Sequence, residues 1–376
     1  MNRMTAIQRY FLLVLVCAVV VACKDDDKEY VEEPATEVTF TTTVQTRAVT
    51  NVVTKLDDGD AMNVFMAEET ADESLQQARN YKAVCQGGVW KGVPAIEFGS
   101  SAKGYLYAVY PYQETSAKMN AVPVDITSQT DYLYSGNGVA VSRNNPKVVL
   151  TMKHALAALA FNIKNDNYAG EGKLEQISIS GKPVCKSGTL DVSSGAVKGT
   201  VSAKYEYACN VNIQQNGWEE NIPEFFCIPF VSSGSDVTVT FKIDGEDYPC
   251  QLPKYGVAGG MKYIFYLSLT EGKLTLFPEQ TKQISLNVDS DSMSIPNYSL
   301  LKIVHDNALF ILPSFKGEGI VGTILWGDGK SEEYGATSEH SYENGQSHTV
   351  TVETWGTEEV SLSSLVGISE IDLSDF

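Results

Sequence analysis

Histidine is rare in this 376-residue sequence, and its few copies form no catalytic or metal-binding pattern. There is no His-Glu-x-x-His motif, no neighbouring cysteine at zinc spacing and no Gly-x-Ser-x-Gly nucleophile elbow. The stretch "GDGKS" is not a phosphate loop, because Ile324 stands where such a loop needs its first glycine. We therefore expect no enzyme, no catalytic residue, no metal and no cofactor. The 4 histidines are His154, His305, His340 and His348.

Positive charge is also scarce. Lys and Arg total 28 against 47 Asp and Glu, and the net charge of −19 becomes −21 if the segment carrying Arg3 and Arg9 is removed. This acidity makes nucleic acid and anionic lipid surfaces poor partners for the body of the protein. After Cys23 the only arginines are Arg47, Arg79 and Arg143, so an arginine-specific protease would find few bonds to cut.

Long hydrophobic runs are missing except near the N-terminus. The apolar run from Tyr10 to Ala22 is too short for a stable membrane span, and with its basic start it predicts a signal peptide over residues 1–22. The sequence "VVAC" that ends at Cys23 resembles a bacterial lipobox. This resemblance implies a lipoprotein whose Cys23 is lipidated, carries palmitate and anchors the chain in outer membrane lipid. The alternative is an ordinary signal peptide followed by a chance cysteine.

An acidic spacer follows over residues 23–36. Its "KDDDKEY" resembles the signal that sends surface lipoproteins to the outer leaflet, and otherwise it is a solvated spacer. This predicts a surface-exposed protein of the cell outer membrane.

Five cysteines remain after Cys23, an odd number that matches no zinc site. We expect most of them to be buried small apolar residues, with Cys209 and Cys227 as the candidate disulfide. The five are Cys85, Cys185, Cys209, Cys227 and Cys250.

Long helical periodicity is absent, whereas valine and tyrosine are plentiful and turn signals recur about every 8 to 12 residues, which predicts an all-β protein. The stretch "EVTFTTTVQTRAV" shows the alternation of a strand with one buried face. Val38, Phe40 and Val44 fall on the apolar face of this strand.

Four stretches resemble, in order, landmarks of the fimbrillin family, the subunits of type V pili. They are "GDAMNVFMAE", "YAVYPYQ", "LTMKHALAALAFNI" and "GGMKYIFYLSLTEGKLTL". The resemblance implies two tandem transthyretin-like β-sandwiches, at residues 37–152 and 153–276. It also implies a lipidated precursor that an arginine-specific protease trims and that polymerises with other fimbrillin subunits into a fimbrium by donor-strand exchange.

The matching cleavage bond joins Arg47 to Ala48. Cleavage there would remove the first strand, with Val38, Phe40 and Val44, together with the lipid. The groove and unpaired strand edge left behind would favour addition of a neighbour's strand.

The chain continues past the usual end of a stalk subunit. The segment "WGDGKSEEYGATSEHSYENGQSHTVTVE" resembles the signature of a PKD-type immunoglobulin-like domain, and we expect such a small β-sandwich over residues 277–360. A tail over 361–376 resembles the start of a leucine-rich repeat. We expect it to cap this domain, pair with another chain or hang loose.

This extra module occupies the end where a stalk subunit carries its donor tail, so the sequence favours a tip or accessory adhesin. Trp326 and Trp355 are the candidate contacts to an unknown host or bacterial surface ligand. The alternatives are a surface-exposed glycan-binding lipoprotein and a pilus anchor subunit, each of which keeps its first strand and lipid.

Overall fold

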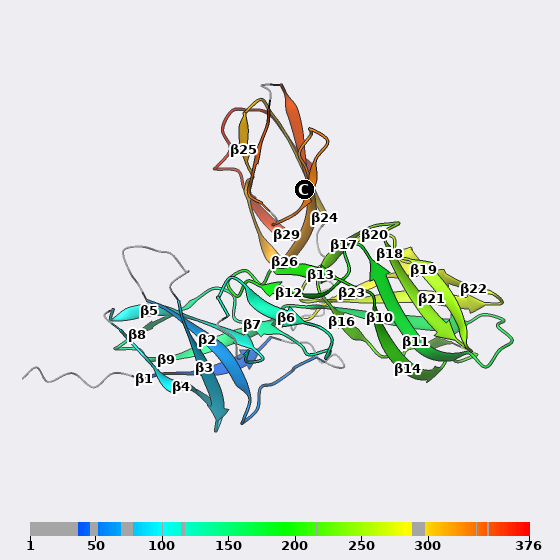
Figure 1. Ribbon diagram of the computed structural model, residues 1–376, viewed down its shortest axis with the longest axis horizontal. Coiled ribbons are helices and arrows are strands. Elements are labelled where there is room, and N and C mark those ends of the chain that lie inside the picture. Colours follow the sequence, from blue (N-terminus) through cyan, green and yellow to red (C-terminus); the bar gives the residue numbers. More distant parts are fainter. Residues whose placement is uncertain are drawn as a thin grey trace, which may run out of the picture. The chain divides into compact units, whose positions relative to one another are not determined.

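The structure, a computed structural model, describes residues 37–45, 52–68, 78–99, 101–113, 117–215, 217–287, 298–335, 337–343 and 346–376. These residues form β-strands with one short 3-10 helix, Pro278–Gln280, which confirms the all-β prediction (Figure 1). No helix in the described ranges is long and apolar enough to cross a membrane. The predicted signal peptide, Cys23, the acidic spacer, Arg47 and Ala48 lie outside them.

The first sheet closes on itself. Its 8 strands follow the order β2-β3-β4-β1-β9-β7-β5-β8, and β2 also pairs with β5, so the strands from β2 round to β5 form a ring. Their bounds are β1 Glu37–Val44, β2 Ala61–Glu68, β3 Arg79–Gln86, β4 Val89–Glu97, β5 Lys103–Tyr110, β7 Leu133–Tyr134, β8 Val139–Ser142 and β9 Lys147–His154.

Alternation along the strands puts one face of each inside this ring. Val38, Met62, Leu106 and Leu150 are each 0 % exposed and belong to one apolar cluster. The first predicted sandwich thus has a core to which β1 contributes side chains directly.

Two further sheets face each other across the largest apolar cluster. Phe161 lies near its centre, with ring centroids 5.0 Å from Phe241 and 5.6 Å from Phe265. One sheet has the order β15-β10-β21-β22, with β16 on β10 and β23 on β21, and the other the order β14-β11-β18-β19. Their bounds are β10 Ala157–Asn165, β11 Lys173–Gly181, β14 Tyr205–Asn212, β15 Trp218–Glu219, β16 Phe225–Cys227, β18 Val237–Ile243, β19 Glu246–Gln251, β21 Met261–Thr270, β22 Lys273–Leu276 and β23 Lys282–Ser285. A separate pair joins β17 Phe230–Ser233 to β20 Lys254–Val257.

The two predicted sandwiches share structure at their junction. A small sheet has the order β13-β12-β6, in which β6, Val122–Asp125, precedes the predicted boundary at residue 152, while β12, Cys185–Leu190, and β13, Val197–Ser202, follow it. One apolar cluster likewise draws on both sides, from Phe65 to Leu286. The boundary at residues 152 and 153 therefore stays a prediction.

Buried polar groups join three distant segments at this junction. His154, 1 % exposed, places Nδ1 2.8 Å from Asp131 Oδ2, and the same carboxylate oxygen accepts the Val53 N–H at 3.0 Å. Asn287 hydrogen-bonds to both backbone groups of His154. Its Oδ1 accepts the His154 N–H at 2.7 Å, and its Nδ2 donates to the His154 carbonyl at 3.3 Å. His154 therefore acts as a packed junction residue, since buried polar groups need partners.

The C-terminal module, residues 298–376, has its own core. Its 5-stranded sheet has the order β27-β26-β29-β24-β30, and β25 pairs separately with β28. Ile303 and Val350 from the sheet and Phe310 from β25 share one cluster, so the two sheets form two layers. The bounds are β24 Tyr298–His305, β25 Leu309–Ile311, β26 Ser314–Leu325, β27 Ser331–Glu333, β28 Glu339–Ser341, β29 His348–Ser361 and β30 Ile368–Asp375.

Two segments differ from expectation. The tail contributes β30, which pairs antiparallel with β24 and joins the module's sheet. The stretch "PEQTKQ", residues 278–283 at the start of the predicted third domain, holds the 3-10 helix and the start of β23, which pairs with β21. In both cases backbone pairing with a distant strand determines the structure.

Gly260 offers a test of the junction. Its φ is +69°, and a Cβ there would lie 2.3 Å from Asn287 Nδ2, whereas Gly272 has the same φ with no atom within 4 Å of its Cβ position. We expect Gly260→Ala to lower the free energy of unfolding by about 1 to 3 kcal/mol more than Gly272→Ala does. Chemical denaturation of both variants measures the difference, and equal losses would show that Asn287 adds no constraint.

Candidate functional site

The strand expected to be removable lies inside the first sheet. β1 pairs antiparallel with β4 from Glu37↔Glu97 to Phe40↔Trp90, and parallel with β9 from Thr39↔Lys147 to Val44↔Met152. Its two neighbours are not paired with each other in the sheet order, so β1 closes the ring of strands (Figure 1). We call its position the β1 slot, the space bounded by β4 and β9.

The side chains of β1 fill the slot as its alternation predicts. Val38 is 0 % exposed and Phe40 is 2 % exposed, while Val44 is half-buried against the same core. Thr41 and Thr43 point outward and are exposed. Burying a large apolar side chain is worth about 1.5 to 3 kcal/mol, so β1 stabilises the ring through its side chains as well as its ladder.

Trp90 on β4 makes the most specific contacts with β1. Its ring stacks on Phe40 with centroids 5.9 Å apart and planes 6° from parallel, and its Nε1–H donates to Thr42 Oγ1 at 3.0 Å. Trp90 itself is 1 % exposed. Trp90 was not among the site residues predicted from the sequence, although "GGVW" after a strand indicates a hairpin that brings a large ring into the sheet.

Loss of β1 would expose both neighbours at once. The core would lose the side chains of Val38 and Phe40. The backbone N–H and C=O groups of β4 and β9 that now bond to β1 would lose their partners. An open edge beside an apolar groove is a template for strand addition. The slot is thus a candidate site for a strand from another chain.

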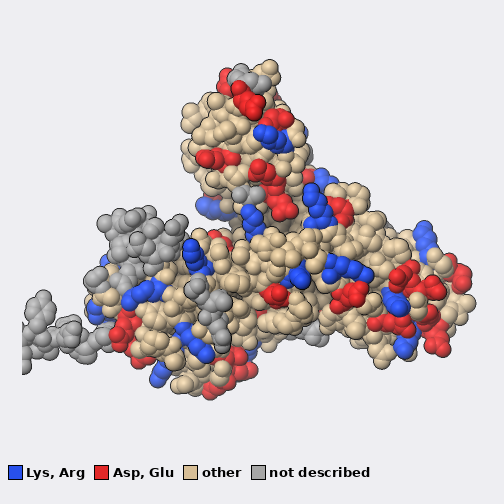
Figure 2. Space-filling model, viewed as in Figure 1, with Lys and Arg blue, Asp and Glu red and all other residues tan. Residues whose placement is uncertain are grey.

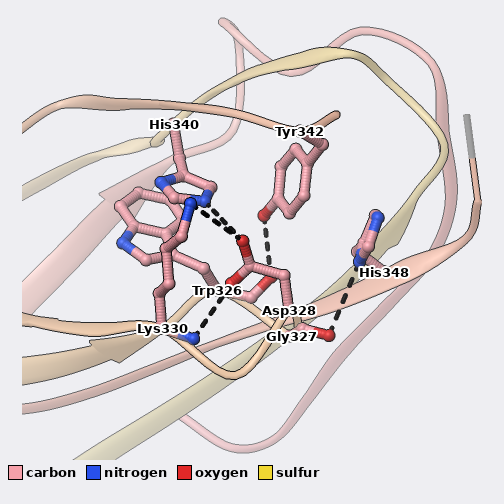
Figure 3. Close-up of polar contacts among 7 residues, drawn as sticks. All are labelled: Trp326, Gly327, Asp328, Lys330, His340, Tyr342 and His348. Atoms are coloured by element: carbon pink, nitrogen blue, oxygen red, sulfur yellow. Dashed lines mark hydrogen bonds and ion pairs between the residues drawn. The ribbon is translucent and has the colours of Figure 1, made fainter. Parts of the chain in front are cut away.

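A second polar and aromatic cluster lies in the C-terminal module, around the turn 326–330 (Figure 3). Asp328 Oδ2 lies 3.0 Å from His340 Nε2 and 3.6 Å from Lys330 Nζ, and Asp328 Oδ1 accepts the Lys330 N–H at 3.0 Å. The hydrogen bond with His340, followed by the Lys330 backbone N–H and the Lys330 ammonium, lowers the pKa of Asp328 from its usual 3.8 to about 2. Asp328 therefore holds the turn closed as a carboxylate.

Aromatic rings surround this turn. His340 stacks on Trp326 at 4.6 Å, Tyr342 stacks on His348 at 4.2 Å, and the Tyr342 hydroxyl donates to the Trp326 carbonyl at 2.7 Å. His305 packs on Phe310, and burial, with His348 nearby, lowers the pKa of His305. Three of the four histidines thus pack within one structural cluster. Among the described residues no group of three His, Cys, Asp or Glu side chains could hold a metal.

The tryptophans expected at a ligand surface are buried instead. Trp326 is 0 % exposed beneath His340, and Trp355 is 7 % exposed beside Tyr298 at 5.3 Å. Neither presents a ring face to solvent, so the interpretation of these two side chains as ligand contacts is wrong. Trp326 belongs to the apolar cluster of the C-terminal module, and Trp355 lies against Tyr298 and Gly256. Trp218, half-buried against Tyr266, is the most exposed tryptophan.

The described cysteines form no disulfide. The 5 described cysteines are free thiols, and Cys85, Cys227 and Cys250 are buried, so the candidate Cys209–Cys227 disulfide is not formed. Burial raises the pKa of Cys209 and of Cys250 to about 11.

Figure 2 shows Lys and Arg interspersed with Asp and Glu on the face in view, so no basic tract dominates that face.

Comparison with known proteins gives a family. The sequence profile described as fimbrillin-like matches residues 46–290, which begins just after β1 and ends before the C-terminal module. No curated protein matches the chain.

Several solved structures resemble the chain. A putative cell adhesion protein from Bacteroides uniformis is 20% identical with a TM-score of 0.48, covering 66% of this chain and 98% of its own. A fimbrial protein from Bacteroides vulgatus is 12% identical with a TM-score of 0.45, covering 66% and 99%. A fimbrial assembly protein from Parabacteroides distasonis is 9% identical with a TM-score of 0.39, covering 67% and 98%.

Asp328 gives a pH-dependent prediction. A carboxyl whose folded pKa is about 2 and whose usual pKa is 3.8 stabilises the fold above pH 3.8, and this contribution is lost as the pH falls through 2. We expect Asp328→Asn to destabilise the C-terminal module by about 1 to 2 kcal/mol at pH 7. The difference from wild type should shrink from pH 4 to pH 2.

Urea unfolding followed by hydrogen exchange of residues 298–376, which separates the C-terminal module from the rest of the chain, measures this effect. The exposed Asp306 of the same module provides the control Asp306→Asn. A difference between wild type and Asp328→Asn that stays constant across this pH range would contradict the assignment.

Proposed function

The chain belongs to the fimbrillin-like family, and from that premise we propose that it is a fimbrial subunit whose β1 is removed and replaced by a strand of another subunit. Membership of a fimbrial and cell adhesion family implies a place in a cell-surface appendage. Our proposal goes beyond family membership in three respects, which are the strand replacement, the lipid on Cys23 and the position in the fibre.

The observation that carries the proposal is the place of β1 in the ring. It bonds to β4 on one side and β9 on the other, while residues 46–51 connect it to the rest of the chain. A single cut in that connection would leave β1 held only by non-covalent contacts. The family match begins at residue 46, just after this strand.

Cleavage after Arg47 would separate β1 from the chain that starts at Ala48. If Cys23 carries lipid, the same cut would leave residues 48–376 attached to the outer membrane only through the non-covalent contacts of β1. The precursor would then be a surface-exposed lipoprotein, and the subunit would be released when β1 leaves its slot. An arginine-specific protease is the partner for this step.

A strand from a second subunit would restore what β1 supplied. Each refilled apolar pocket contributes about 1.5 to 3 kcal/mol and each ladder bond about 0.5 to 1.5 kcal/mol. Part of this is offset by the entropy of association. The ladder with β9 spans Thr39 to Val44, so several of these free-energy contributions add up along one contact between two subunits.

The C-terminal module supports a tip or accessory position. Its last strand, β30, is paired with β24, so donating that segment would first require breaking this pairing. A subunit that accepts a strand and does not donate one ends a fibre. The module would then present its surface to a host or bacterial ligand, without using the buried Trp326 and Trp355.

Arg47→Lys tests the maturation step. The substitution keeps the positive charge but removes the side chain that an arginine-specific protease recognises, so we expect the mature N-terminus at Ala48 to disappear and the chain to remain a lipidated precursor outside fibres. Mass spectrometry of surface protein and fibre preparations measures both effects. Arg143→Lys, in the turn between β8 and β9, makes the same change at another arginine and is the matched control. Normal processing of Arg47→Lys would contradict the proposal.

A further inference from the structure

The backbone hydrogen bonds that β4 and β9 offer to a strand in the slot do not favour one amino-acid sequence over another. Its two neighbours offer one parallel and one antiparallel ladder, and any extended segment without proline could pair with them. Selection of one partner among many extended segments must therefore come from side chains that face the slot. Few groups in the slot can provide it, because most of its lining is aliphatic.

Trp90 contributes both an aromatic ring and a polar N–H to the core around β1. It is 1 % exposed, and both of its specific contacts are to β1: the stacked ring of Phe40 and the hydroxyl oxygen of Thr42. If the occupant lacked an acceptor opposite Nε1–H, the indole donor would be buried without a partner. Leaving a buried donor unpaired costs more than an ordinary hydrogen bond contributes.

We propose that Trp90 selects the replacing strand, a segment of another fimbrillin subunit that carries an aromatic residue at the position of Phe40 and a hydrogen-bond acceptor two residues later. This inference rests on the proposed function and names the partner of the same slot. The expected motif is aliphatic-x-aromatic-x-acceptor-x-aliphatic, as in Val38, Phe40, Thr42 and Val44. Of the alternate positions, Thr41 is exposed and Thr43 is exposed with its hydroxyl 3.5 Å from that of Thr151.

The test uses the full chain with a specific protease site inserted after Arg47. Cutting after folding leaves β1 bound as a peptide, which is then displaced by an excess of labelled peptides spanning residues 37–45. The peptides are wild type, Phe40→Leu, Thr42→Val and the control Thr41→Val. Phe40→Leu keeps apolar volume without a ring, Thr42→Val keeps shape without an acceptor, and Thr41→Val makes the same change on the exposed face.

We expect the wild-type and Thr41→Val peptides to bind equally. Thr42→Val should bind about tenfold more weakly, since it leaves the indole N–H unpaired, and Phe40→Leu should also bind about tenfold more weakly, through lost stacking and altered packing. In a Trp90→Phe chain, which keeps a ring but has no N–H, the penalty for Thr42→Val should vanish. The thermal melt of the uncut Trp90→Phe chain confirms that it folds.

The outcomes separate the two proposals. If the wild-type peptide never displaces β1, replacement itself is overturned, and this inference with it. If all four peptides bind equally, or if the Thr42→Val penalty persists in Trp90→Phe, strand replacement stands and selection by Trp90 is overturned.

Discussion

The insertion of β1 between β4 and β9 is the contact on which the first sheet depends. An edge strand such as β8 has one neighbour, but β1 has two, and its Val38 and Phe40 also lie inside the core. Its loss would therefore remove ladder bonds on both sides together with core packing. A single short segment thus controls whether the ring is closed, and any segment of the right shape in its place would close it again.

The far end of β9 is held by contacts that do not depend on β1. β9, one wall of the slot, ends at His154, whose backbone is clasped by Asn287 and whose ring meets Asp131. β10 begins at Ala157 and enters the largest core. The wall is therefore anchored at its far end by contacts that do not include β1. An opened slot would leave β9 held at this end, while residues 147–152 would lose their ladder partner.

The sequence predicts faces better than neighbours. Period-two alternation correctly placed Val38 and Phe40 inside and Thr41 and Thr43 outside, because it follows from strand geometry alone. It could not show that Trp90 meets Thr42, a pairing 48 residues apart that depends on register across the ring. The same limit explains the tail: β30 pairs with β24 more than 60 positions earlier, which no local signal at 361–376 reveals. Trp326 was misassigned because aromatic residues serve both cores and ligand surfaces.

A strand can be both well buried and replaceable only if its departure and its replacement are coupled. An empty slot would leave the Trp90 indole N–H without its Thr42 acceptor and expose the surface that Val38 and Phe40 cover, so the opened state is high in free energy. After a cut near Arg47, β1 would still remain bound through these contacts. In the proposed exchange, an incoming strand would take over the ladder and pockets progressively as β1 leaves. The cut would permit that exchange, and the match between strand and slot would decide which partner completes it.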